Sequence, residues 1–451
     1  MARPARLIPS SDALAAAFDD ALTMALADLP RRFHDLPVNL ITAVSGGPDS
    51  MALAHLAEDY ANRHGGAHRA LVVDHGIRSD SADEALRVVA RLHDIGMDAE
   101  VLTVTAQAPS AGIQDWARAS RYDLLFKAAR RAGACLLLGH HAGDQAETVM
   151  MRLARGSGLA GLAGMRRATI RDGVAILRPL LDADRAAIIE FCDRHRLLVE
   201  HDPSNADSRF ERVRSRQTLA EMDRLGRMAS AGLLRLSRAA ASIDAILLDR
   251  FGEAGFPTSP AASGHVTLPD KLLQLPVVAQ TRLLAQVIRL VAMPRHGPEQ
   301  GALHRLVRRL ADNRPATLGG ARFTKGEAGW LVTAEMGRKP PRCDVAAGAT
   351  VLFAGTWLVY SPVAATVRYL GEAGSGAGAG WHDSAGWSGL LPLVRRSLPV
   401  LETLDGRLLY PHLIQQGQVV RRGALATAEC LRHTNTPFPA KTKGHSKRPS
   451  M

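Results

Sequence analysis

Six residues decide how this chain folds: Ser45-Gly46-Gly47-Pro48-Asp49-Ser50. They follow an apolar, β-branched run over 38–44, and apolar residues then recur at helical spacing from Met51 to Asn62. The pattern predicts a strand, a glycine turn and a helix. Consecutive glycines let the backbone approach a ligand closely, and the amides at a helix N-terminus attract anions. The turn therefore predicts a phosphate-binding loop, against the simpler alternative of a tight turn that only caps the helix.

Asp49 distinguishes this loop from the common GxxxxGK[ST] phosphate loop, in which a lysine reaches the β- and γ-phosphates. An aspartate would repel phosphate unless a Mg²⁺ ion lay between the two. The loop therefore predicts a nucleotide-binding site that also contains Mg²⁺.

Further strand candidates follow at intervals that suit a repeating strand–helix unit. The second candidate ends at Asp74-His75, the third covers 100–104, and the fourth ends at Gly139-His140. Short apolar strands that alternate with longer helical stretches predict an α/β protein with a doubly wound parallel sheet. Ligands bind outside the carboxyl ends of the strands in such a sheet. We therefore expect Asp74, His75 and His140 to lie near the phosphate-binding loop.

Seven short motifs follow one another along residues 38–218. In chain order they are SGGPDS (45–50), VDHGIR (73–78), RxxRY (118–122), GHHAGDQAET (139–148), RLARGSGLAGLAGM (152–165), RPLL (178–181) and DPSN (202–205). As a set they resemble the tRNA(Ile)-lysidine synthetases, which are N-type ATP pyrophosphatases. The first loop alone would indicate only that superfamily. The resemblance implies an adenine nucleotide alpha hydrolase-like fold with a PP-loop.

Two positions depart from the family pattern. The family commonly has two adjacent acids in its HHxDDQxET run, whereas this chain has Gly143 before Asp144. It also often has RNxxR after DPSN, and here Val213 replaces the asparagine between Arg212 and Arg216. The second acid and both arginines are therefore retained.

The resemblance also implies a reaction, the ATP-dependent ligation of free L-lysine to C2 of the wobble cytidine in the isoleucine tRNA with a CAU anticodon. ATP adenylates the C2 carbonyl oxygen and releases pyrophosphate; lysine then displaces AMP to form lysidine, which changes codon reading from AUG to AUA. Charge that develops at the α-phosphate would be stabilised by Mg²⁺, backbone amides and arginines. ATP and Mg²⁺ are the implied cofactors, and the sequence leaves a homodimer open.

Three groups of site residues follow from these motifs and from the basic helices. Catalysis is assigned to Asp49, Asp144 and Arg212, and Mg²⁺ binding to the two aspartates. ATP binding is assigned to Ser45, Gly46, Gly47, Pro48, Asp49, Ser50, Asp74, His75 and His140. Contacts with tRNA or phosphate are assigned to Arg118, Arg121, Arg216, Arg305, Arg308 and Arg309. The alternative for the arginines is an ordinary solvated basic face, and for His140 and His141 an ordinary hydrogen-bonding role.

The charge of the chain suits a polyanionic partner, because 56 basic residues against 44 acidic ones leave a net charge of +12. Residues 281–310 alone hold six arginines and one acid, whereas short β-branched runs follow after residue 313. The predicted parts are a helical N-terminal extension (1–36), an N-type ATP pyrophosphatase catalytic domain (37–220), a helical tRNA-binding domain (221–312), a small β-rich C-terminal domain (313–436) and a basic tail expected to be disordered (437–451).

Two other functions are left open by the sequence. Related ATP pyrophosphatases that thiolate tRNA commonly use paired cysteines, and the four cysteines here, at 135, 192, 343 and 430, include no CxxC pair. The second alternative is a non-catalytic tRNA-binding protein on a decayed scaffold, which the intact Asp49 and Asp144 disfavour. Few cysteines, no membrane-spanning apolar stretch and no signal-peptide pattern lead us to expect a cytoplasmic protein.

Overall fold

The computed structural model describes residues 11–29, 39–77, 80–171, 173–200, 211–261, 263–294, 297–337, 339–354, 356–371, 390–409 and 419–421. The DPSN motif and the basic tail lie outside them. The chain forms two compact units, one made of 1–258, 267–289 and 294–332, and the other of 259–266, 290–293 and 333–451. The five-part division expected from the sequence stays a prediction.

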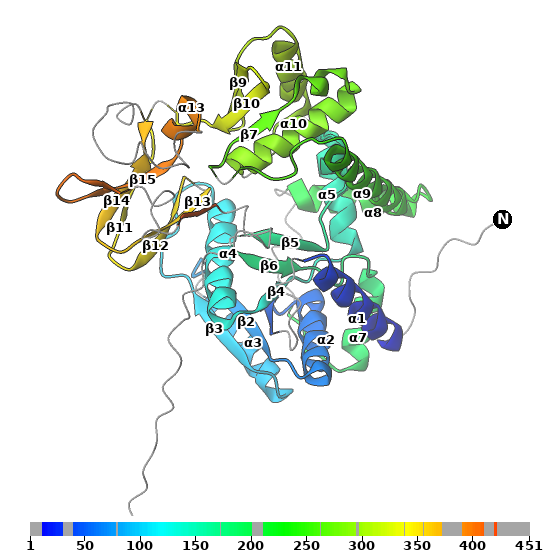
Figure 1. The fold of residues 1–451 in the computed structure, drawn as a ribbon. Helices are drawn as coiled ribbons and strands as arrows, with labels where there is room; N and C mark the ends of the chain where they lie inside the picture. Colours follow the sequence, from blue (N-terminus) through cyan, green and yellow to red (C-terminus); the bar gives the residue numbers. More distant parts are fainter. Residues whose placement is uncertain are drawn as a thin grey trace, which may run out of the picture. The chain divides into compact units, whose positions relative to one another are not determined.

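A six-stranded sheet organises the first unit (Figure 1), with strand order β3-β2-β1-β4-β6-β5. Five strands are parallel: β1 (Leu40–Val44), β2 (His68–Asp74), β3 (Ala99–Thr103), β4 (Cys135–Leu137) and β6 (Val174–Leu177). The edge strand β5 (Ala168–Arg171) is antiparallel to β6, because the short turn at Gly173 makes the pair a hairpin. The predicted doubly wound parallel sheet is confirmed, and the antiparallel edge is an addition.

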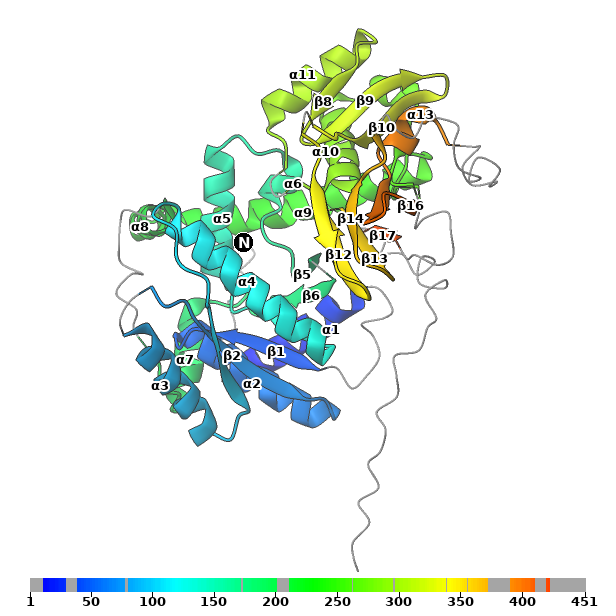
Figure 2. The same cartoon turned by 90° about the vertical axis from the view of Figure 1, so that its left-hand side faces the viewer.

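Helices cover both faces of this sheet because its strands are apolar on both sides. Leu40 and Val44 of β1 pack into a core with α1 (Ser11–Ala27), α2 (Pro48–His64), α3 (Ser81–Asp94) and α7 (Arg185–Arg194). Ile41, which points the other way, packs with α4 (Ile113–Ala132). Figure 2 shows α4 on one side of the strands and α2, α3 and α7 on the other. This wrapping leaves the carboxyl ends of the strands as the edge at which ligands bind.

Helices that follow the fourth strand complete the first unit. Helix α5 (Ala142–Ala154) contacts α6 (Leu159–Leu162), α8 (Glu211–Arg224) and α9 (Ala229–Glu253). Later in the chain come β7 (Val266–Leu268), a 3-10 helix (Asp270–Gln274), α10 (Val277–Ala292) and α11 (Gln300–Ala311). A four-stranded sheet, ordered β7-β10-β9-β8, joins β7 to β8 (Ala316–Leu318), β9 (Ala321–Gly326) and β10 (Gly329–Ala334).

The second unit is rich in strands, as the sequence predicts for the later part of the chain. One sheet has the order β11-β14-β15-β16, from β11 (Arg342–Val345), β14 (Ala365–Tyr369), β15 (Pro399–Thr403) and β16 (Leu408–Leu409). The other has the order β12-β13-β17, from β12 (Ala349–Phe353), β13 (Trp357–Ser361) and β17 (Val419–Arg421). A short helix, α13 (Pro392–Arg396), precedes β15.

Candidate active site

The predicted phosphate-binding loop lies where β1 ends and α2 begins, with Gly47 as the N-cap residue of α2. Gly46 has a φ of +82°, which L-residues with a side chain rarely adopt. A Cβ atom at this position would lie 2.7 Å from Cγ2 of Val88 and 3.1 Å from Cγ of Glu200. Only glycine fits here, so the loop backbone is held open toward the edge of the sheet.

Hydrogen bonds within the loop fix its shape. The hydroxyl of Ser50 donates to the carbonyl of Gly47 (2.9 Å) and accepts from the amide of Ser45 (3.1 Å). The amide of Glu200 donates to the carbonyl of Gly46 (2.8 Å). Ser50 is buried and its hydroxyl is already used by the loop, whereas Ser45 is exposed. The structure therefore gives Ser50 a shaping role, and phosphate binding by this loop stays a prediction.

Asp74 is the last residue of β2 and His75 follows it, at the same edge of the sheet. One carboxylate oxygen of Asp74 accepts from the amide of Gly76 (2.9 Å) and from the hydroxyl of Ser81 (2.7 Å), which fixes the turn into α3. Burial lowers the pKa of His75, and the nearby charge of Arg121 lowers it further. His75 is therefore neutral at neutral pH, and an arginine of α4 lies close to the end of β2.

The fourth strand brings a second set of side chains to the loop. A Cβ atom on Gly139 would lie 3.0 Å from the backbone oxygen of Asp49, so the chain after β4 passes directly against the start of α2. Nε2 of His141 lies 3.8 Å from Oδ1 of Asp49 and 3.7 Å from Oδ2 of Asp144. The two acids predicted from separate motifs thus both lie within 4 Å of one imidazole nitrogen.

His141 is the N-cap residue of α5, and its hydrogen bonds define its tautomer. Its Nδ1 accepts from the amide of Gly143 (3.0 Å), so the proton of the neutral ring is on Nε2, facing both carboxylates. Asp144 completes a capping box, since its Oδ2 accepts from the amide of His141 (3.0 Å). A Cβ atom at Gly143 would lie 2.7 Å from Cε1 of His141, so the ring fills the space beside this glycine.

The carboxyl group of Asp49 has a shifted pKa and an oxygen without a hydrogen bond to any described residue. Burial raises its pKa, the neighbouring Asp144 raises it further, and His141 and Arg185 oppose the shift. Its Oδ1 is buried and makes no hydrogen bond to any described residue. A cation would satisfy this oxygen, and Mg²⁺ prefers one or two carboxylates together with phosphate oxygens. Asp49 and Asp144 therefore fit a Mg²⁺ site, and no larger cluster of three or more metal-ligating side chains occurs among the described residues.

Glu147, which the sequence analysis did not single out, forms an ion pair at the base of this site. It is buried on α5, and Nε of Arg216 donates to its Oε1 at 2.6 Å. Nη2 of the same arginine lies 3.9 Å from Oδ1 of Asp144. The spacing of Asp144 and Glu147 places both on one face of a helix, which is the signal that could have found Glu147. Arg212 also lies on α8, but its side chain is not described.

Replacing Arg216 by Met is expected to destabilise the protein, because the buried carboxylate of Glu147 would lose the ion pair with this arginine. Breaking a fully buried pair costs about 3–5 kcal/mol. Arg216 is 37% exposed, so we expect a smaller loss in the free energy of unfolding, roughly 1–3 kcal/mol. Urea denaturation measures it. The double variant Arg216→Met/Glu147→Gln should recover much of the loss, and equal stability of the single and double variants would contradict the pair.

The remaining predicted arginines lie on two other helices. Arg118 and Arg121 of α4 place their guanidinium carbons 5.3 and 5.7 Å from the ring centroid of Tyr122. Helix α11 buries Leu303, Leu306 and Leu310, and leaves Arg305, Arg308 and Arg309 exposed. Exposure is what an RNA contact requires, but it is also what a solvated face shows, so these assignments stay predictions.

Comparison with known proteins identifies the family. A family model described as a PP-loop domain matches residues 23–222. The tRNA(Ile)-lysidine synthase of Rhodopseudomonas palustris is 39% identical over 307 residues, which cover 65% of this chain and 87% of that protein. This chain belongs to the tRNA(Ile)-lysidine synthase family. The tRNA(Ile)-lysidine synthase of Bradyrhizobium diazoefficiens is 34% identical over 354 residues, covering 74% of this chain and 93% of that protein.

Membership in the tRNA(Ile)-lysidine synthase family confirms the resemblance found in the motifs and makes the chain an ATP-dependent, ligase-type enzyme. A solved structure of the U34-tRNA thiolase NcsA from Methanococcus maripaludis, with its [4Fe-4S] cluster, matches with a TM-score of 0.42 and 15% identity. That match covers 50% of this chain and 80% of the thiolase. Among the described residues, no helix has the length and apolar character needed to cross a bilayer.

Proposed function

We propose that this chain joins free L-lysine to the wobble cytidine of the isoleucine tRNA with a CAU anticodon, through an adenylated tRNA intermediate. The observation that carries the proposal is the convergence of Asp49 and Asp144 on Nε2 of His141 beside the phosphate-binding loop. Adenylation needs a site that holds a triphosphate and neutralises charge at the α-phosphate. The loop amides and the N-terminus of α2 suit the first task, and the two carboxylates suit a Mg²⁺ ion for the second.

The residues of the chain divide the work as follows. Gly46 and Gly47 hold the loop backbone open, so that its amides and those of α2 can bind the pyrophosphate as it leaves. Mg²⁺, when bound, neutralises the phosphate oxygens. The backbone amide of His141 holds the carboxylate of Asp144, and its ring does not act as a general base, because Nδ1 is occupied by the amide of Gly143 and Nε2 carries the proton. The attacking amine of lysine must then lose its proton to a carboxylate or to water.

The test is mass spectrometry of nucleosides from an unmodified isoleucine tRNA transcript that has been incubated with the protein, ATP, Mg²⁺ and lysine. We expect lysidine at the wobble position, and an adenylated tRNA when lysine is omitted. A folded protein that binds the tRNA and ATP but yields neither product would overturn the proposal. Incorporation of sulfur instead of lysine would establish the thiolation alternative.

The two cysteines of the first unit, Cys135 and Cys192, are poor candidates for the sulfur carrier of a thiolation reaction. Burial raises the pKa of the thiols of Cys135 and Cys192 to about 11, so neither is a thiolate at neutral pH. A sulfur carrier needs an accessible thiolate. Cys343 lies on β11 in the second unit, and Cys430 is outside the described residues.

The exposed arginines of α11 give a test of where tRNA binds. Replacing Arg305, Arg308 and Arg309 together by Gln should weaken tRNA binding and flatten its dependence on salt, by about 0.7–0.9 in the log–log slope for each lost phosphate contact. Fluorescence anisotropy with a labelled tRNA at several salt concentrations measures both quantities. ATP–pyrophosphate exchange should stay within a few fold of wild type. An unchanged slope in the folded triple variant would assign these arginines to a solvated helix face.

A further inference from the structure

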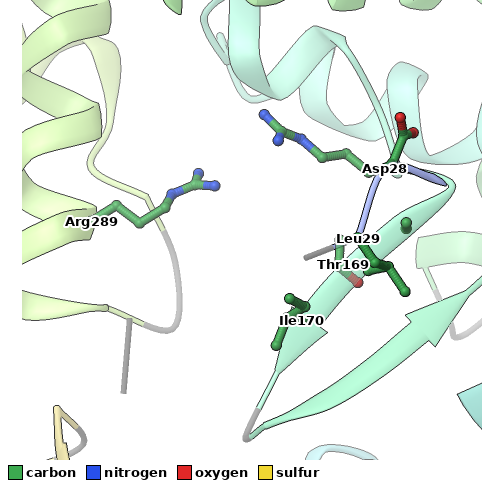
Figure 3. Close-up of a pocket in the computed structure, with 7 residues that line it drawn as sticks. Asp28, Leu29, Thr169, Ile170 and Arg289 are labelled. Atoms are coloured by element: carbon green, nitrogen blue, oxygen red, sulfur yellow. The ribbon is translucent and has the colours of Figure 1, made fainter. Parts of the chain in front are cut away.

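A cavity of about 270 Å³ lies beside the edge strand β5, away from the phosphate-binding loop. It is lined by residues 168–170 of β5, by Arg166 just before them, by Asp28 and Leu29 at the end of α1, and by Arg289 of α10. Figure 3 shows the side chain of Arg289 extending from its helix toward Thr169 and Ile170, with Asp28 and Leu29 on the far side. Nothing in the proposed chemistry uses this cavity.

The groups behind the cavity carry an excess of positive charge. Asp244 is buried on α9, and Arg282 donates to it through Nε and, at 3.1 Å, through Nη2. Arg166 donates to the same carboxylate at 3.3 Å. Among the described residues, the hydrogen bonds that Arg152 donates go to the neutral carbonyls of Gly161 and Gly164. Four guanidinium groups, from Arg152, Arg166, Arg282 and Arg289, therefore face two carboxylates, from Asp244 and Asp28.

Among these four arginines, Arg289 is one whose positive charge forms no ion pair with a described carboxylate. It makes no hydrogen bond or ion pair with any described residue, and its side chain is open to the cavity. Burial lowers its pKa, and the like charges of Arg166 and Arg282 lower it further. An anion placed between Arg289 and Arg166 would relieve this repulsion and would meet donors from two elements. The forked geometry of guanidinium groups matches phosphate oxygens.

We propose that this cavity is a binding site for a phosphate oxyanion. Its volume of about 270 Å³ is ample for a phosphate group. β5 is three strands from β1, or about 14 Å at the usual strand spacing, so the oxyanion is separate from a triphosphate on the loop. The bound oxyanion is either a backbone phosphate of the tRNA or free phosphate or pyrophosphate. The first of these two cases rests on the proposed function.

The deciding variant is Arg289→Gln, with Arg250→Gln as a matched control that removes an equal charge from an exposed position on α9. Because Arg289 has no partner among the described residues, Arg289→Gln should keep the melting temperature of the wild type. The first measurement of the test is tRNA binding as a function of salt concentration, by fluorescence anisotropy. Binding of inorganic phosphate and of pyrophosphate is measured separately by isothermal titration calorimetry.

If the source is RNA, Arg289→Gln lowers the log–log salt slope by about 0.7–0.9, and Arg250→Gln leaves it unchanged. If the source is a free anion, Arg289→Gln abolishes phosphate or pyrophosphate binding and leaves the slope unchanged. No effect of Arg289→Gln in either measurement, or equal effects of the control, would overturn the site. If the wild-type protein shows the Arg289-dependent binding but forms no lysidine, the proposed function is refuted and the oxyanion site stands.

Discussion

Asp49→Asn and Asp144→Asn are each expected to lower the rate of adenylation by about a hundredfold or more. Each change removes one of the two carboxylates that lie within 4 Å of Nε2 of His141, and with it the anionic charge that a Mg²⁺ ion requires. A loss of a few kcal/mol of transition-state stabilisation is enough for an effect of this size. ATP–pyrophosphate exchange in the presence of the tRNA measures it. Wild-type exchange in either variant would remove that aspartate from the proposed site.

The melting temperature of Asp49→Asn shows whether a loss of adenylation comes from the active site or from a folding defect. The pKa of Asp49 is raised in the folded protein, so its ionised form costs stability at neutral pH, and this cost disappears as the pH falls below the raised pKa. Without ATP and Mg²⁺, Asp49→Asn should therefore match or exceed the wild-type melting temperature at neutral pH, and the advantage should shrink in acid. Affinity for tRNA should stay within a few fold.

Gly46→Ala is expected to abolish ATP binding at concentrations that saturate the wild type. The positive φ of Gly46 costs any L-residue about 1–2 kcal/mol, and the new Cβ atom would also be forced against Val88 and Glu200. Overpacking of this kind typically costs a further 1–3 kcal/mol or so, or displaces the backbone. Here the displaced backbone is the loop that has to bind phosphate.

Gly65→Ala is the matched control for this change. Gly65 ends α2 with a φ of +68°, and a Cβ atom there would meet nothing within 4 Å. It should therefore show only the backbone cost, with ATP binding intact. Calorimetric titration of ATP and thermal unfolding of both variants measure the difference. Equal losses in the two variants would show that the contacts of Gly46 with Val88 and Glu200 are unimportant.

The central sheet and the loop could be predicted from the sequence because their signals are local. The glycines, Asp49 and the apolar runs before and after them are adjacent in the chain, and the ends of the first, second and fourth strands carry polar clusters of their own. The antiparallel edge was not predicted, since a hairpin of two short strands leaves no helical stretch between them. The pairing of β7 with β10 was missed for another reason: a three-residue strand inside a helical region has no periodicity to detect.

Contacts between distant residues account for what the sequence did not show at the site. Arg216 was expected to contact phosphate, and nothing in its neighbourhood of the chain indicates that it pairs with Glu147, 69 residues earlier. The same holds for Arg282 and Asp244, which come together only when α10 packs near α9. Ser50 lies within the predicted loop, but the direction of its hydroxyl depends on the backbone that surrounds it.

The imidazole beside Gly143 has a consequence for how this protein can change over evolutionary time. Restoring the acid that the family commonly has at position 143 would place its Cβ atom within 2.7 Å of the His141 ring, so the ring would first have to rotate out of its cap. That rotation would also withdraw Nε2 from Asp49 and Asp144. Substitutions at 141 and 143 are therefore coupled rather than additive, and the order in which they occur matters. The family run HHxDDQxET has a histidine at the position of His141 as well, so an acid at 143 calls for another rotamer of this ring and not for its replacement.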